Sequence, residues 1–142
     1  MAPRVAWEPS SGHTFPMPGT TEPVTDRAAR SENRPWGSYS VLDDAADHKI
    51  KRIVVHPGHR LSYQRHAHRS EHWFVIRGGG VVTIDGLDVE VTAGSAVDVP
   101  RGAAHRITNT GTTDLVFVEV QHGDSFAEEY IERLEDDYGR SN

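Results

Sequence analysis

The stretch GHRLSYQRHAHRSEHWFVIRG, residues 58–78, and the stretch GSAVDVPRGAAHRITN, residues 94–109, decide the fold of this chain. Each of them places polar side chains at set distances between glycines. Amide, imidazole and carboxylate groups all bind divalent ions, so the two stretches together offer one set of metal ligands. The spaced residues of the first stretch are Gly58, Gln64, His66, Glu71 and Gly78. Those of the second stretch are Gly94, Pro100, Gly102, His105 and Asn109.

The segments around these two stretches indicate an all-β protein. Short runs of β-branched or alternating residues are separated by glycine-rich turns, which is typical of strands. Asp85-Gly86, between two alternating runs, predicts a two-residue hairpin turn. Strands this short with turns this regular predict a closed or double-sheet barrel. The expected strands are residues 38–42, 48–56, 62–65, 72–77, 81–85, 87–92, 96–99, 105–108 and 115–121.

The C-terminal region carries a different pattern. Its apolar side chains are Phe126, Tyr130, Ile131 and Leu134. This spacing matches one face of a helix. We therefore expect one short helix over residues 125–134, packed on the barrel.

The length of 142 residues leaves room for one domain with a working core. Residues 1–33 are rich in proline, with serine, threonine and glycine between the prolines and no periodic apolar run. We interpret them as a flexible N-terminal arm. The alternative is that part of the arm forms an edge strand swapped onto a partner subunit. The folded domain is expected over residues 34–142.

Composition also excludes several classes of function. The chain has no cysteine, which excludes disulfides and thiol chemistry. It has no apolar run of membrane-spanning length and no secretion signal, so a cytoplasmic protein is expected. The net charge of −6 argues against a nucleic-acid partner. Six arginines nevertheless lie in the segment from Gly58 to Arg106. A positively charged site opening in a protein of negative net charge suits an anionic small molecule.

The two opening stretches resemble the two-part motif of cupin barrels, with the leading histidine of the first part replaced by Gln64. More specifically, the segment from Arg34 to Arg140 resembles the cupin domain of type II mannose-6-phosphate isomerases. In bacteria that domain often follows a mannose-1-phosphate guanylyltransferase domain in one polypeptide. The matching words are RPWGS at 34–38, LSYQ at 61–64, RHAHRSEHW at 65–73, PRGAAHR at 100–106, EVQ at 119–121 and DDYGR at 136–140.

The resemblance implies a single-domain cupin, that is, a double-stranded β-helix or jelly-roll barrel. It also implies an aldose–ketose isomerase that interconverts mannose 6-phosphate and fructose 6-phosphate. No glycine-rich nucleotide-binding stretch accompanies the domain here. We therefore expect a free-standing cupin domain that does not make GDP-mannose by itself.

Two registers of the metal ligands compete. Alternate residues of a strand point to the same side, so Gln64, His66 and His68 could all face the barrel interior. A pair of His66 and His68 would break the motif spacing, whereas a pair of Gln64 and His66 keeps every spacing. Type I phosphomannose isomerases have a similar Leu-Ser-x-Gln-x-His word that supplies a glutamine and a histidine to zinc. The expected ligands are therefore Gln64, His66, Glu71 and His105.

One amide oxygen, two imidazoles and one carboxylate suit a single divalent ion. Zinc is the first choice, and manganese, cobalt and iron are the alternatives. Four protein ligands leave a position for water or substrate, as a catalytic site requires. His68 is kept as a neighbour of the metal or a substitute ligand. His72 follows Glu71 directly and should point to the opposite side of its strand.

The implied reaction moves a proton between C2 and C1 of the sugar through a cis-enediol. A divalent ion can stabilise the charge on the carbonyl oxygen, and a general base must reach the carbon proton. His68 is the first choice for this base and Glu71 the second. Arginine binds two phosphate oxygens with its forked donors. The expected phosphate clamp is Arg60, Arg69 and Arg106, with Lys51 as a weaker candidate.

Because one fold serves many functions, two alternatives stay open. One is a metal-dependent dioxygenase or isomerase that acts on a different small polar substrate. The other is a sugar-binding cupin without catalysis. Small cupins tend to pair through barrel strands, so we expect a homodimer. Its partner molecule would be a small sugar phosphate, with no nucleic acid and no membrane.

Overall fold

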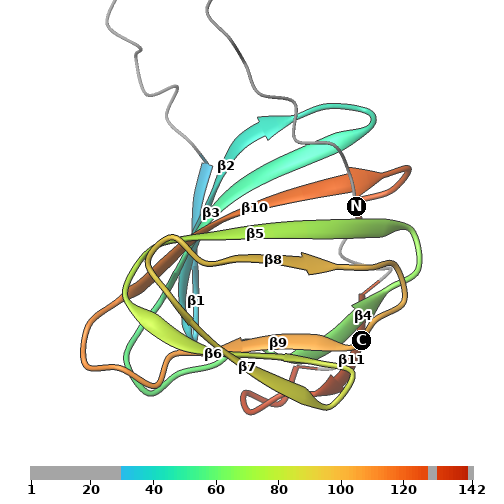
Figure 1. Ribbon diagram of the computed structural model, residues 1–142. Coiled ribbons are helices and arrows are strands. Elements are labelled where there is room, and N and C mark those ends of the chain that lie inside the picture. The colour runs from blue at the N-terminus through green and yellow to red at the C-terminus, as the bar shows by residue number, and fades with distance from the viewer. Residues whose placement is uncertain (1–29, 128–130, 141–142) are drawn as a thin grey trace, which may run out of the picture.

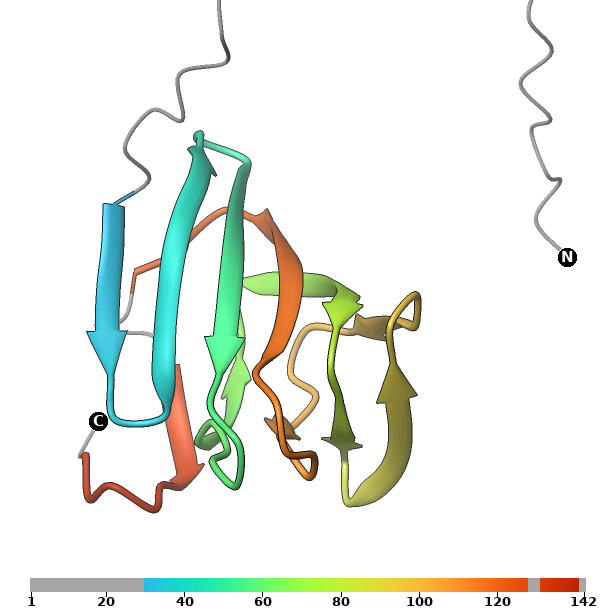
Figure 2. The same ribbon diagram turned by 90° about the vertical axis from the view of Figure 1, so that its left-hand side faces the viewer.

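The structure, a computed structural model, describes residues 30–127 and 131–140. All regular elements in these ranges are strands, which form two antiparallel sheets that close into a barrel (Figure 1, Figure 2). One sheet has the order β1-β2-β3-β10-β5-β8 and the other β11-β4-β9-β6-β7. The expected all-β jelly-roll barrel is confirmed. The strands are β1 (Arg30–Arg34), β2 (Gly37–Asp44), β3 (His48–Val55), β4 (Tyr63–His66), β5 (Arg69–Arg77), β6 (Gly79–Ile84), β7 (Leu87–Thr92), β8 (Ala96–Val99), β9 (His105–Thr108), β10 (Leu115–Gly123) and β11 (Ile131–Glu135).

The strands expected between residues 38 and 121 are all present, with bounds that differ by a few residues. The expected hairpin turn between β6 and β7 is also confirmed. Asp85 and Gly86 have positive φ angles of 47° and 79°, as a type I′ turn requires. β5 begins at Arg69, earlier than expected, and this places Glu71 inside a strand with a defined inward direction.

The short C-terminal helix expected over residues 125–134 is wrong. Residues 128–130 lie outside the described residues, and Ile131–Glu135 form β11, which pairs with β4. β4 is short and pairs with β9 at one position only, so without β11 its other edge would leave backbone groups unpaired. Pairing with β11 satisfies these groups and buries Ile131 opposite His66. This tertiary contact outweighs a helical pattern that depended on four apolar residues.

The first sheet begins within the segment that composition assigned to the N-terminal arm. Residues 1–29 lie outside the described residues, whereas Arg30–Arg34 form β1 and pair with β2 without interruption. The hydroxyl oxygens of Ser31 and Ser40 lie 2.8 Å apart across this pair. β1 is therefore ordered by its pairing with β2, and the composition of residues 1–33 did not predict this strand.

The interior of the barrel changes from apolar to polar along its strands. Phe117 lies between Ile53 and Val75 in the sheet register, whereas Glu119, two residues further on, lies between Lys51 and Trp73. The apolar layer supplies the hydrophobic core, and the polar layer lines the rest of the interior. The apolar layer consists of Ile53, Val55, Trp73, Val75, Ile107, Leu115 and Phe117. The polar layer consists of Lys51, His66, Arg69, Glu71, His105, Glu119 and Gln121.

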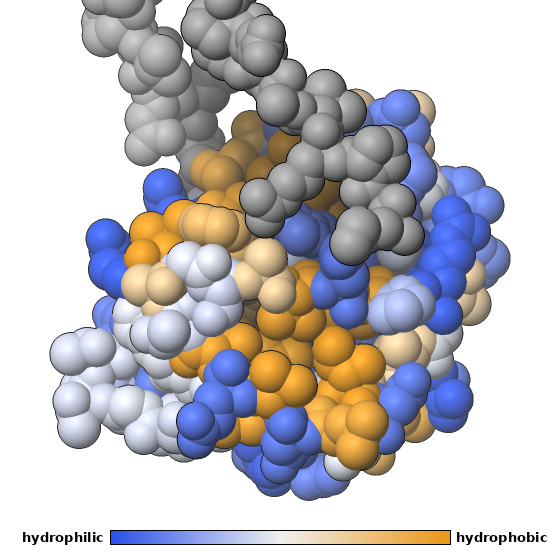
Figure 3. All heavy atoms as spheres, viewed as in Figure 1, coloured by the Kyte–Doolittle hydropathy of each residue, from blue (hydrophilic) through white to orange (hydrophobic). Residues whose placement is uncertain are grey.

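The outward sides of the strands also carry apolar residues. Phe74 and Ile76 on β5 and Leu87 and Val89 on β7 are all exposed. In Figure 3, apolar atoms gather on the face that β5, β7 and β8 present to the viewer. The polar interior and the partly apolar exterior are thus separated by the alternation of side chains along each strand.

Gly80 allows β6 to approach β9 closely. A Cβ atom at this position would lie 2.2 Å from the carbonyl oxygen of Thr108, which is backbone and cannot move aside. We expect Gly80→Ala to lower the free energy of unfolding by about 2–3 kcal/mol, as overpacking of a dense interior does. Chemical denaturation monitored by tryptophan fluorescence measures this change.

The neighbouring Gly79 provides the control. A Cβ atom there would lie 3.3 Å from the carbonyl oxygen of Val91 and requires only a small shift. Gly79→Ala should therefore cost clearly less stability than Gly80→Ala. Equal costs for the two variants would show that the close approach of β6 to β9 is not the constraint.

Candidate metal centre

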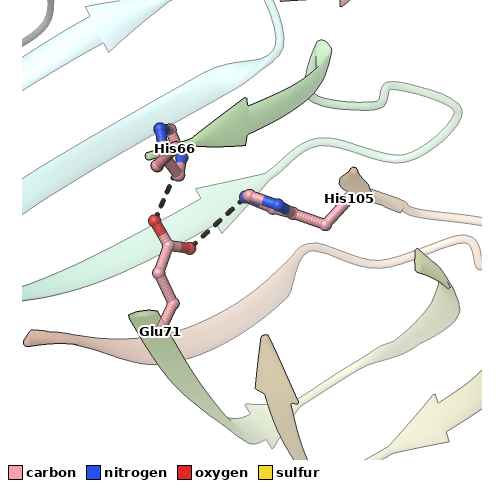
Figure 4. A group of neighbouring side chains, drawn as sticks. All are labelled: His66, Glu71 and His105. Atoms are coloured by element: carbon pink, nitrogen blue, oxygen red, sulfur yellow. Dashed lines mark ion pairs between the residues drawn. The ribbon is translucent and has the colours of Figure 1, made fainter. Parts of the chain in front are cut away.

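Three buried side chains from three strands converge in the polar layer. His66 ends β4, Glu71 lies on β5 and His105 begins β9, and Figure 4 shows all three pointing toward one another. His66 Nε2 lies 3.2 Å from Glu71 Oε1, and His105 Nε2 lies 3.6 Å from Glu71 Oε2. One candidate ligand atom from each residue lies within 4.8 Å of the other two. This spacing is compatible with one ion bound by all three side chains.

His105 is oriented as metal-binding histidines usually are. Its Nδ1 donates a hydrogen bond of 2.9 Å to the carbonyl oxygen of Ala103. Because that bond requires the proton on Nδ1, Nε2 is left with a free lone pair. Nε2 is buried and has no hydrogen-bond partner among the described residues. A divalent ion would satisfy this nitrogen, so the cluster fits the metal that the sequence leads us to expect.

Glu71 stays ionised although it is buried. Trp73 Nε1 donates to its Oε2 at 3.0 Å, and Arg69 Nε donates to its Oε1 at 3.2 Å. Burial raises the pKa of Glu71, but the hydrogen bond with His66 and the attraction of the two histidines and Arg69 outweigh burial and lower that pKa to about 2. Burial lowers the pKa of His66. The ionised carboxylate is the form of Glu71 that binds a metal ion.

Gln64 lies on the same face of β4 as His66, two residues before it. It is directly opposite His105 in the pairing of β4 with β9, and it lines the same cavity as Glu71. Facing residues in such a pair have their Cβ atoms about 5 Å apart. The structure therefore brings together all four residues that the sequence proposed as ligands.

The structure places the other two histidines of this region outside the cluster. His68 lies in the turn after β4, with its side chain 47% exposed and its Nδ1 3.6 Å from Asp124 Oδ1. β4 ends at His66, so the alternation that would have turned His68 inward does not reach it. His72 lies on the outer side of β5, where its Nδ1 is 2.6 Å from Asp98 Oδ1. The outward direction expected for His72 is confirmed.

Two of the four basic residues expected at the substrate lie in the interior. Arg69 is buried, and its Nη2 lies 3.2 Å from His66 Nε2. Lys51 is also buried, with its Nζ 4.4 Å from the centre of the Tyr39 ring. Both side chains line the cavity beside Glu71.

The other two basic residues line a groove on the opposite side of the second sheet. Arg106 follows His105 on β9, and the alternation of side chains turns it away from the cluster. Arg60 pairs with Asp137 at 2.6 Å, and both arginines pair with Glu135. The structure therefore does not bring Arg60 and Arg106 to the candidate metal centre.

The cavity has a basic rim that the sequence analysis missed. Arg34, Arg133 and Arg140 line it and are partly exposed. Arg140 is held by Asp136, whose pKa is lowered to about 2, mainly by the hydrogen bond with Arg140. The words RPWGS and DDYGR contain Arg34 and Arg140 and could have indicated them. Arg133 was hidden because its segment was expected to be a helix.

The comparison with protein families agrees with this geometry. A family described as "Mannose-6-phosphate isomerase C-terminal" matches residues 24–136. The chain belongs to this family. Its match covers all four candidate ligands and every matching word except DDYGR, of which it includes only Asp136, so the resemblance seen in the sequence is confirmed.

Three relatives of the chain are longer proteins of known name. AlgA, an alginate biosynthesis protein of Pseudomonas aeruginosa, is 44% identical over 108 residues, which are 76% of this chain and 22% of AlgA. XanB, a xanthan biosynthesis protein of Xanthomonas campestris, is 41% identical over 112 residues, 79% of this chain and 24% of XanB. The mannose-1-phosphate guanylyltransferase of Escherichia coli is 41% identical over 114 residues, 80% of this chain and 24% of that protein. The chain thus spans less than a quarter of the length of these relatives.

Solved structures confirm the cupin fold. CapF, a capsular polysaccharide assembling protein of Staphylococcus aureus, has a TM-score of 0.68 at 22% identity over 76% of this chain and 34% of CapF. A Klebsiella pneumoniae protein with a double-stranded β-helix domain has a TM-score of 0.61 at 23% identity over 68% of this chain and 83% of that one. At these identities the likeness concerns the fold alone.

The cluster predicts which histidine substitutions abolish metal binding. We expect His105→Ala to weaken the binding of zinc by more than about 100-fold, because loss of a direct ligand exceeds the usual effect of losing a supporting contact. His72→Ala should leave zinc binding unchanged, since this exposed ring lies on the other side of β5. Isothermal titration calorimetry on chelator-stripped protein measures both. Similar losses in the two variants would contradict the assignment.

The same assay distinguishes the two possible ligand pairs, Gln64 with His66 and His66 with His68. Gln64→Ala should weaken zinc binding, whereas His68→Ala should not, because only Gln64 shares the inward face of His66. The opposite result would restore the pair of His66 and His68.

Proposed function

We propose that this domain interconverts mannose 6-phosphate and fructose 6-phosphate with one divalent metal ion held by Gln64, His66, Glu71 and His105. Family membership supports the reaction class. The observation that carries the proposal is the charge of the cavity that Gln64 and Glu71 line. Five basic side chains line this cavity against two carboxylates, which suits an anionic substrate. The basic side chains are Arg34, Lys51, Arg69, Arg133 and Arg140.

The exposure of these basic residues supports one orientation of the sugar phosphate. Arg34, Arg133 and Arg140 are partly exposed, whereas Lys51 and Arg69 are buried. A phosphate group is strongly hydrated and is bound well by forked guanidinium donors at the rim. The phosphate group of the substrate therefore binds to the three arginines of the rim. The C1–C2 end of the sugar then points inward toward the cluster.

Contacts within the protein hold the side chains of this site in fixed positions. A bound divalent ion would act as a Lewis acid that stabilises negative charge on the carbonyl oxygen. Trp73 and Arg69 hold the carboxylate of Glu71 in place, and Ala103 holds the ring of His105. The apolar layer behind Trp73 excludes water from that side. The site is thus organised before substrate enters, which favours catalysis.

The proposal predicts metal-dependent isomerase activity. Chelator-stripped protein should convert mannose 6-phosphate to fructose 6-phosphate only after it is reloaded with a divalent ion. A coupled spectrophotometric assay follows product formation with zinc, manganese, cobalt and iron in turn, and His105→Ala serves as the inactive control. Tight metal binding without turnover would reject the isomerase and favour a different substrate or a sugar-binding cupin.

The position of the arginines predicts which of them recognises phosphate. Arg140→Gln should raise KM for mannose 6-phosphate about tenfold or more with little change in kcat, because phosphate binding is lost equally in the ground state and the transition state. Arg60→Gln should leave KM unchanged, since Arg60 lies in the outer groove. A rise in KM with Arg60→Gln alone would instead favour the clamp expected from the sequence.

The remaining expectations concern partners and location. In the described part of the chain, no helix is long and apolar enough to cross a membrane. The homodimer, the lack of a nucleic-acid partner and the cytoplasmic location stay predictions.

A further inference from the structure

Two buried polar side chains of the cavity have no role in the site described so far. Glu119 and Gln121 lie on the inward side of β10 and are 5% and 1% exposed. Glu119 lies opposite Lys51 of the neighbouring strand β3, and Gln121 lies opposite Glu71 of the neighbouring strand β5. Both line the same cavity as Gln64 and Glu71. Burial of such groups in a barrel is costly, which suggests a chemical use.

Gln121 is oriented toward Glu119 and toward the cavity. Its Nε2 donates a hydrogen bond to Glu119 Oε1. Its own Oε1 is buried and has no hydrogen-bond partner among the described residues. A buried amide oxygen without a hydrogen bond destabilises the fold unless a ligand donates to it. A hydroxyl group of a sugar is such a donor.

The surroundings of Glu119 raise the pKa of its carboxyl group. Burial, followed by the negative charge of Glu71, raises the pKa of Glu119 from 4.5 to about 7. Lys51 on β3, Arg69 on β5 and the hydrogen bond from Gln121 act in the opposite direction. A carboxyl group balanced in this way can both accept and release a proton at the pH of the cell.

The other candidates for proton transfer fit less well. His68, the base expected from the sequence, is exposed in a turn and does not line the cavity. Glu71 does line it, but Arg69 and Trp73 engage both of its carboxylate oxygens. Glu119 is the other carboxyl group among the residues that line this cavity.

We propose that Glu119 is the acid–base residue of the isomerisation and that Gln121 is the residue that positions it. This inference rests on the proposed function. The Glu119 carboxylate takes the proton from C2, and the electron pair of the broken C–H bond forms the C1=C2 double bond of the enediol. The oxygen on C1 takes up a proton from water at the same stage, and water regains a proton from the hydroxyl on C2 in the next step. Glu119 then returns its proton to C1 while the hydroxyl on C2 loses one, so a carbonyl forms at C2 and no other reactant is needed.

The first test compares Glu119→Gln with the wild type, both reloaded with the metal that supports turnover. We expect kcat to fall about 1,000-fold, within the range for loss of a general base, with zinc affinity and melting temperature close to those of the wild type. Glu90→Gln, the same chemical change on the exposed side of β7, should keep full activity. With mannose 6-phosphate that carries deuterium at C2, the wild type should transfer deuterium to C1 of fructose 6-phosphate, because Glu119 returns the proton that it took, and Glu119→Gln should not.

If Glu119→Gln does not fold, Glu119→Asp replaces it in the comparison. Aspartate keeps the carboxyl group but withdraws it by one methylene, so a fall in kcat of about 10-fold to 100-fold is expected, in line with the cost of a small misplacement. An unchanged kcat in Glu119→Asp would argue against direct proton transfer by this residue.

The second test concerns Gln121. The base must be ionised, so kcat/KM should rise with pH through the pKa of Glu119. Gln121→Met removes a hydrogen bond that lowers this pKa, and the rising limb should therefore move to higher pH. A residue with a merely structural role would lower activity without moving the profile.

The outcomes separate the two proposals. If the wild type turns over and Glu119→Gln keeps at least a tenth of that activity, the role of Glu119 is rejected and the isomerase stands. If the wild type is inactive with all four metals, the proposed function is rejected and the role of Glu119 with it.

Discussion

A buried, ionised carboxylate at Glu71 is the interaction on which the candidate site depends. An isolated charge inside a protein costs several kcal/mol, and this cost persists unless partners surround the charge on all sides. Here the partners come from three directions: Trp73 and Arg69 on its own strand, His66 on β4 and His105 on β9. None of them can be moved by one residue without turning outward, because side chains alternate along a strand. The charge therefore ties the register of three strands to the chemistry of the site.

Trp73 joins this polar cluster to the hydrophobic core. Its ring lies 5.1 Å from that of Phe117 and 5.6 Å from that of His105, measured between ring centres. Its indole nitrogen donates to Glu71. One side chain thus packs in the apolar layer and supports a candidate ligand in the polar layer. This link holds Glu71 and His105 in place, because Trp73 is itself fully packed.

The same barrel interior explains why some local expectations failed. The alternation that turns Gln64 and His66 inward was readable in the sequence, but it holds only while β4 lasts, and β4 ends before His68. The segment after residue 125 showed apolar residues at helical spacing, yet the unpaired edge of β4 recruits it as a strand. Arg60 and Arg106 are close in sequence to the metal motif, and both face the outer groove. The pairing of β11 was decided by a strand distant in sequence, whereas the outward direction of Arg106 follows from side-chain alternation next to the inward-facing His105.

The sequence by itself determined the barrel, its strands between residues 38 and 121, and the residues that gather at the candidate metal centre. These depend on spacing along one strand or within one motif, and the two-residue period of a strand carries that information locally. Only the tertiary structure decided which basic side chains meet the cavity and where β11 pairs. It also decided that Glu119 and Gln121 lie buried beside Glu71. The burial of Glu119 and Gln121 arises from the pairing of β10 with β3 and β5, and the place of Arg133 arises from the pairing of β11 with β4. These strands are far apart in the chain, and no local pattern encodes their register.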